Sequence, residues 1–231
     1  MSTHHDPAAW DRLARGTGLT GLLTIPLVFV PTIALSTLGE PPLDARADET
    51  VAFLTNLAES SWAPVASVAQ SVAVLVLLWW AAAFTHVMRR AEGEPSWRST
   101  AALASIVILA GHVVLESSFQ AAVHMGNPEP ELALFAFESG NLGFANSWLA
   151  LGSFAVACGW VIISTRMLAP GLGWLAVVSG AGFVVARIFW TSSLWLLPYA
   201  AFWIWVVAVC VSLLRRSRVR ATPAATPVTA P

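Results

Sequence analysis

Four polar side chains recur at four-residue intervals between residues 112 and 124: His112, Glu116, Gln120 and His124. Because four residues advance an α-helix by slightly more than one turn, these side chains form one winding polar stripe. Ionisable groups are costly inside a lipid bilayer, so His112 and Glu116 are candidates for binding a solute and for responding to protons. The stripe is predicted to face other helices or a water-filled cavity.

A further charge, Arg187, interrupts the apolar stretch 172–192. Counting inward at about 1.5 Å per residue places Glu116 roughly 12 Å and Arg187 roughly 8 Å from the outer ends of their helices. Because an unpaired charge in hydrocarbon costs much more than a hydrogen-bonded pair, we predict that these two side chains meet. Three neutral polar residues fall at a similar depth: Gln70, Asn146 and Tyr199.

Two interpretations of this polar centre remain open. A pocket that opens to the outside would bind or pass a small solute or a cation. A closed network of interhelical hydrogen bonds would only hold the bundle together, as in a non-catalytic membrane partner or scaffold subunit.

Catalytic and cofactor-binding patterns are absent from the sequence. It contains no Gly-x-Ser-x-Gly elbow and no phosphate-binding glycine loop, so no catalytic residue is predicted and an enzyme is the least favoured class. All basic residues are arginine, which excludes the lysine Schiff bases of retinal and pyridoxal proteins. A zinc site with His112 and Glu116 needs a third ligand, and His124 lies about 18 Å along the same helix. Neither a metal nor a cofactor is predicted.

The composition indicates that these residues lie in a membrane. Of the 231 residues, 57% are hydrophobic and 11% are charged, against about 25% charged in an average soluble domain. A membrane-spanning helix needs about 20 mostly apolar residues. Six such runs cover residues 17–38, 63–87, 100–123, 142–165, 172–192 and 194–214. The sequence therefore predicts an all-α fold, a polytopic membrane bundle of six transmembrane helices.

The segments outside these runs are polar. Apolar residues recur at helical spacing within the connector 40–61, which predicts a short interfacial helix on the outer membrane surface. Residues 1–16 are predicted to be a cytoplasmic N-terminal segment, residues 17–214 the membrane domain, and residues 215–231 a basic and then disordered cytoplasmic tail. Pro26 and Pro31 predict a kink in the first span, where a broken helix could serve gating.

Arginine placement predicts the orientation of the chain. All arginines except Arg46 and Arg187 flank one side of the predicted spans, and positively charged flanks stay in the cytoplasm. The expected location is therefore the cell membrane, with several spans and both chain ends cytoplasmic. The loops on the other side are acidic, which either attracts cations or simply keeps these loops soluble.

The expected partners follow from this placement. The lipid bilayer is the main one, and the basic run after residue 214 is predicted to anchor the last helix to anionic lipid rather than to bind nucleic acid. Three small residues, Ala176, Gly180 and Gly182, allow close helix approach, which serves either packing within the bundle or a homo-oligomer.

The layout resembles that of small six-helix integral membrane proteins of actinobacteria whose function is unknown. The resemblance rests on a long outer loop after the first span, an arginine-rich inner loop with the sequence MRRAEGEPSWR, and a third span with an internal glutamate in GHVVLESSF. It covers most of the chain and implies a fold but no activity.

Overall fold

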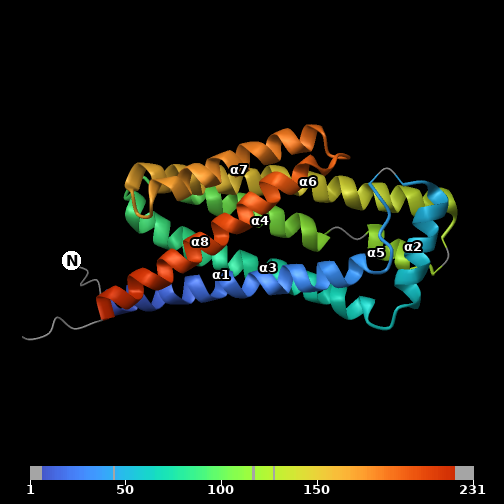
Figure 1. Cartoon of the computed structure of the whole chain (residues 1–231), viewed down its shortest axis with the longest axis horizontal. Coiled ribbons are helices and arrows are strands. Elements are labelled where there is room, and N and C mark those ends of the chain that lie inside the picture. The colour runs from blue at the N-terminus through green and yellow to red at the C-terminus, as the bar shows by residue number, and fades with distance from the viewer. Residues whose placement is uncertain (1–6, 44, 116–117, 127, 222–231) are drawn as a thin grey trace, which may run out of the picture.

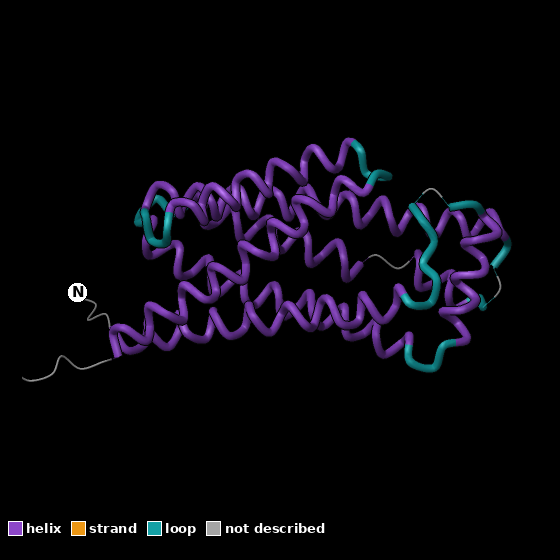
Figure 2. The backbone as a smooth tube through the Cα atoms, in the orientation of Figure 1, coloured by secondary structure: helices purple, strands orange, loops and turns teal. Residues whose placement is uncertain are grey.

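The computed structural model describes residues 7–43, 45–115, 118–126 and 128–221, and it is helical without strands over these residues. Figures 1 and 2 show long helices running side by side, with short connections at the two ends of the bundle. The helices are α1 (Pro7–Ser36), α2 (Ala47–Glu59), α3 (Ala63–Glu92), α4 (Trp97–Leu115), α5 (Ser118–His124), α6 (Pro130–Thr165), α7 (Pro170–Ile188) and α8 (Leu196–Ala221). A 3-10 turn, η1 (Ser193–Trp195), precedes α8. The all-α prediction is confirmed.

Five of these helices are long and apolar enough to cross a membrane, namely α1, α3, α6, α7 and α8. In the described part of α4, an apolar stretch covers Trp97–Val113, which is shorter than these spans. The chain is thus a multi-pass membrane protein by the length and composition of its helices. The count of six spans, which needs α4 to cross as well, stays a prediction.

Three helices extend beyond the predicted membrane spans, whose own limits stay predictions. The first helix begins at Pro7 rather than near residue 17, because its first turns pack along α3, where Trp10 contacts His86 and Arg90. The helix that contains the fourth predicted span begins at Pro130 rather than near residue 142. The basic segment that follows residue 214 continues α8 as far as Ala221, whereas residues 222–231 lie outside the described part of the chain.

The first predicted span differs from the expectation, and part of the third lies outside the described residues. Helix α1 runs unbroken through Pro26 and Pro31, so it is not a broken helix. Within the stretch 100–123, residues up to Leu115 lie in α4 and residues from Ser118 lie in α5, and residues 116 and 117 lie outside the described residues. Helix α2 occupies much of the connector 40–61, while its place on an outer membrane surface stays a prediction.

Aromatic side chains fill the centre of the main bundle. Trp80 of α3 stacks on Phe84 at 5.6 Å between ring centroids, and its ring meets Trp205 of α8 edge-on at 6.3 Å. Phe154 of α6 contacts the same two tryptophans. These four large side chains, which come from three helices, therefore pack against one another in the buried core.

Glycines bring α6 and α7 into backbone contact. A methyl group added at Gly159 would lie 2.5 Å from the carbonyl oxygen of Gly173, and one added at Gly152 would lie 2.8 Å from that of Gly180. Small residues allow such close approach between membrane helices. Gly180 therefore serves packing within the bundle, and Gly182 likewise faces Pro198 of α8.

A second, smaller core lies beyond the main bundle. It is formed by α2, α5 and the first turns of α6, and we call this unit the cap. Phe53 of α2 meets Phe137 of α6 edge-on at 6.3 Å, with Leu54, Ala122 and Ala133 buried around them. This packing explains why the polar-looking segment 130–141 is helical.

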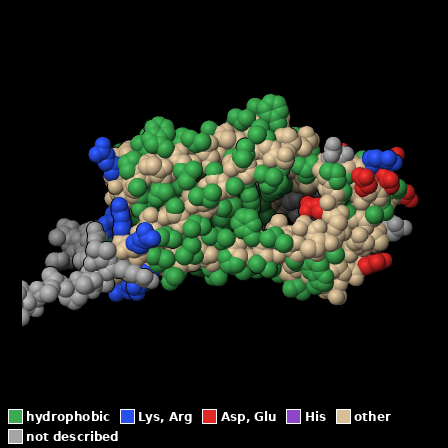
Figure 3. Space-filling model, in the orientation of Figure 1, with side chains coloured by type: hydrophobic (Ala, Val, Ile, Leu, Met, Phe, Trp, Pro, Cys, Tyr) green, Lys and Arg blue, Asp and Glu red, His purple; other side chains and the backbone are tan. Residues whose placement is uncertain are grey.

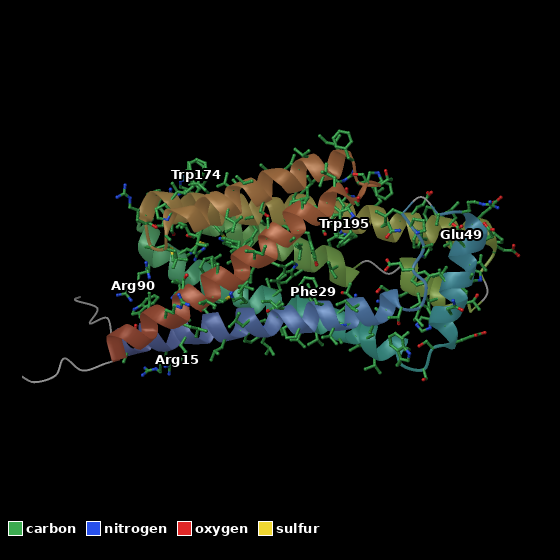
Figure 4. The ribbon with its side chains drawn as sticks, viewed as in Figure 1. Arg15, Phe29, Glu49, Arg90, Trp174 and Trp195 are labelled. Atoms are coloured by element: carbon green, nitrogen blue, oxygen red, sulfur yellow. The ribbon has the colours of Figure 1, made fainter. Side chains whose placement is uncertain are left out.

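Charge is segregated between the two ends of the molecule. Figure 3 shows basic side chains gathered at the end where α1 begins and α8 ends, and acidic side chains gathered around the cap. We call these the arginine end and the acidic end. In Figure 4, Arg15 and Arg90 lie at the former and Glu49 at the latter.

Candidate functional site

Arg187 lies near the end of α7 and contacts the neighbouring helix α6. Its Nε donates a hydrogen bond of 2.8 Å to Oδ1 of Asn146. Two of the residues predicted to converge are therefore brought together. Glu116, the predicted partner of Arg187, lies outside the described residues, so that ion pair stays a prediction.

The packing of α4 against α6 places His112 at the same level. Ser105 of α4 donates a 2.8 Å hydrogen bond to Ser153 of α6, and the two helices run in opposite directions. His112 follows Ser105 by seven residues, and Asn146 precedes Ser153 by seven. Seven residues are about two helical turns, or roughly 10 Å, and return to nearly the same face. His112 and Asn146 are thus set at one level on facing sides of α4 and α6.

The imidazole of His112 has a buried polar atom with no partner. Its side chain is half-buried, its Nε2 is inaccessible, and no described residue lies within hydrogen-bonding distance of that nitrogen. Buried polar groups in native proteins are almost always satisfied by protein, water or a ligand. A polar atom from another molecule would complete the hydrogen bonding of this nitrogen.

The other predicted site residues are distributed around the bundle. Gln70 of α3 donates a 3.1 Å hydrogen bond to Thr32 of α1. Tyr199 of α8 lies in an aromatic cluster, with its ring centroid 5.6 Å from that of Trp195 and 6.2 Å from that of Phe29. Figure 4 shows Phe29 and Trp195 on different helices in the half of the bundle nearer the cap.

The last two residues of the predicted stripe lie in the cap. Gln120 and His124 belong to α5, and the side chain of Gln120 is exposed. His112 lies on α4, and the described residues show no hydrogen bond between it and either of these two side chains. The centre that the structure brings together consists of His112, Asn146 and Arg187, and we call it the α4–α6–α7 centre.

A carboxylate clamp at the arginine end was missed by the sequence interpretation. The Glu92 side chain is 1% exposed and pairs with Arg98, whose Nε lies 2.9 Å from Glu92 Oε1. Glu92 also accepts hydrogen bonds from the backbone N–H groups of Arg98 and Ser99 and from the Ser99 hydroxyl. These N–H groups lie in the first turn of α4, where helical N–H groups otherwise lack partners. Glu92 thereby fastens the end of α3 to the start of α4.

The clamp extends to α6, because Arg98 Nη1 donates a 2.7 Å hydrogen bond to Ser164. A sequence signal that could have identified Glu92 is an acidic residue at the end of one helix, followed by a short Gly- and Pro-containing turn that leads into the next helix. Three α4 residues, Arg98, Ser105 and His112, thus recur every seven positions, and the first two bond to α6. The polar face of α4 is directed toward α6 rather than toward lipid.

The structure shows no metal-binding cluster within its described ranges, where no group of three or more His, Cys, Asp or Glu side chains could hold an ion. Comparison with known proteins finds no relative: no family model, no curated protein and no solved structure matches this chain.

Proposed function

We propose that this chain is a cell-membrane protein that binds a small solute from the outer face, in the α4–α6–α7 centre. The observation that carries the proposal is the buried, unpartnered Nε2 of His112 at the level of Asn146 and Arg187. A guanidinium has five N–H donors, and the bond to Asn146 uses one of them. The centre therefore supplies donors for a solute that carries hydrogen-bond acceptors.

The charge distribution supports the orientation in this proposal. Basic flanks remain in the cytoplasm during membrane insertion, so the arginine end is assigned to the cytoplasm and the cap to the outside. The chain termini then lie on the cytoplasmic side, which requires α4 to cross as a sixth span. Glu116, one helical turn after His112 in the sequence, belongs to the proposed centre as the acidic partner of Arg187.

A second candidate function is that of a non-catalytic membrane partner or scaffold subunit. The observation in its favour is that Gln70 and Ser105 each bond to a residue of one neighbouring helix, as polar groups do when they only join helices. A membrane enzyme is less favoured, because His112 would need a second reactive group within hydrogen-bonding reach.

A stability screen on the purified full chain tests the proposal. The panel contains amino acids, carboxylates, sugars and simple cations, and the readout is the midpoint of thermal unfolding. A solute that binds the centre should raise the midpoint by about 5 °C or more at roughly 100 times its dissociation constant. The same solute should not stabilise His112→Leu or Arg187→Leu.

The matched control is Ser105→Ala, which removes a polar group from the same α4–α6 contact two turns away from His112. This variant should keep the full solute-induced shift. A solute that stabilises His112→Leu as strongly as the native protein binds elsewhere. A panel in which no solute shifts the midpoint favours the scaffold function.

A further inference from the structure

A pocket at the arginine end is separate from the α4–α6–α7 centre. It has a volume of about 360 Å³, within the range of roughly 300–1,000 Å³ that is typical of small-molecule sites. Helices α1, α3 and α8 and the turn after α6 all contribute to its walls. The lining residues are Trp10, Asp11, Ala14, Val87, Arg90, Ala91, Met167, Leu213 and Arg216.

One arginine of this pocket, Arg90, packs against the indole ring of Trp10. The guanidinium carbon of Arg90 lies 4.0 Å from the centroid of the Trp10 ring, at a cation–π distance. Trp10 itself stacks on His86, with 5.5 Å between centroids and 8° between the ring planes. Because His86 and Arg90 lie one turn apart on α3, Trp10 crosses from α1 to contact both. These contacts fix the position of the Arg90 guanidinium.

The second arginine reaches the pocket from α8. Arg216 donates a hydrogen bond from Nη1 to the backbone carbonyl of Met167, in the turn between α6 and α7. This bond anchors a long side chain whose guanidinium carries further N–H donors. Two guanidinium groups from different helices therefore line one pocket. Guanidinium groups are well suited to phosphate because their planar donors match its oxygens.

The charge and polarity of the walls indicate what kind of phosphate fits. The charged lining residues are Asp11, Arg90 and Arg216, whose formal charges add up to about +1, and this matches the single negative charge of a phosphodiester. The remaining walls include the apolar side chains of Val87 and Leu213. An apolar wall beside a basic rim suits a lipid, whose glycerol and first methylene groups continue from the phosphate.

The position of the pocket along the bundle agrees with the binding of a lipid phosphate. It lies where α1 begins and α8 ends, at the end of the molecule where basic residues gather (Figures 1 and 3). Tryptophan and arginine are enriched at this level of membrane proteins, where the headgroups lie. We infer that the arginine-end pocket binds the phosphodiester headgroup of an anionic phospholipid.

Lipid titration of the full chain in detergent tests this inference. The probes are phosphatidylglycerol, zwitterionic phosphatidylcholine and inorganic phosphate, and the readout is the thermal unfolding midpoint. Phosphatidylglycerol should raise the midpoint in a saturable manner, and the other two probes should not. The double variant Arg90→Gln with Arg216→Gln should weaken the apparent affinity for phosphatidylglycerol at least about tenfold, because charge-assisted hydrogen bonds are lost.

The adjacent arginines provide a control with the same change of charge. Arg89→Gln with Arg215→Gln alters neighbouring positions on α3 and α8 that do not line the pocket, so this variant should keep the affinity within about twofold. If both double variants lose affinity equally, diffuse attraction rather than a pocket binds the lipid, and the inference is overturned. Equal stabilisation by inorganic phosphate or by phosphatidylcholine overturns it as well. If the pocket double variant does not fold, each single variant should still show weaker binding, and unchanged affinity in both would contradict the inference.

Discussion

Replacing Glu92 with glutamine should lower the free energy of unfolding by about 3 kcal/mol. The Glu92 side chain is 1% exposed and that of Arg98 is 18% exposed, so the lost charge leaves a largely buried guanidinium without its counter-charge. The new amide nitrogen is also a donor, whereas the carboxylate oxygens accept from donors on both Arg98 and Ser99. Removing one member of a buried charge pair is costly for this reason.

Thermal unfolding in one mild detergent measures this effect, and the midpoint should fall by about 6 °C or more. Glu94→Gln is the matched control, because Glu94 is exposed and lies in the same connection between α3 and α4. Its stability should stay within about 0.5 kcal/mol of the native value. Equal midpoints for the two variants would show that the clamp contributes little to stability.

A methyl group added at Gly159 should lower the free energy of unfolding by about 3 kcal/mol. The added carbon of Gly159→Ala would lie 2.5 Å from the carbonyl oxygen of Gly173 and 3.1 Å from the Cβ of Ala176. A backbone oxygen cannot rotate away as a side chain can, so α6 and α7 must separate. Their separation removes close packing along the whole contact between the two helices.

Gly171→Ala is the control for this second variant. It adds the same methyl group at the start of α7, where no atom lies within 4 Å of the new carbon. Stability should be unchanged or raised by about 0.5 kcal/mol, because alanine restricts the unfolded chain. Unfolding midpoints of both variants in the same detergent provide the comparison. If Gly159→Ala unfolds at the native midpoint, then α6 and α7 do not need backbone contact.

Most of the membrane helices could be predicted because their apolar runs alone are about as long as a bilayer is thick. Helices α3, α7 and α8 all begin within a few residues of the predicted spans. The start of α6 could not be predicted in this way, because Glu131 and Glu138 make the segment look like a loop. That segment is helical because it packs on α2 and α5, which is a tertiary effect.

The depth of the candidate site residues could be counted along the sequence, but their neighbours could not. Arg187 and Asn146 were expected to share one polar level, and the hydrogen bond between them agrees with this. Depth does not reveal which helices are adjacent, and α6 packs against both α4 and α7. The described partner of Arg187 is accordingly Asn146 of α6.

The length of α6 has a mechanical consequence. Its 36 residues form one unbroken helix of about 54 Å, whereas the hydrocarbon core of a bilayer is about 30 Å thick. The same rod holds Phe137 in the cap, Asn146 at the α4–α6–α7 centre and Ser164 in the clamp. A helix without a kink bends little, so a tilt imposed on the cap turns α6 as a lever. A displacement of Phe137 would thereby be transmitted toward Ser164 at the other end of the same helix.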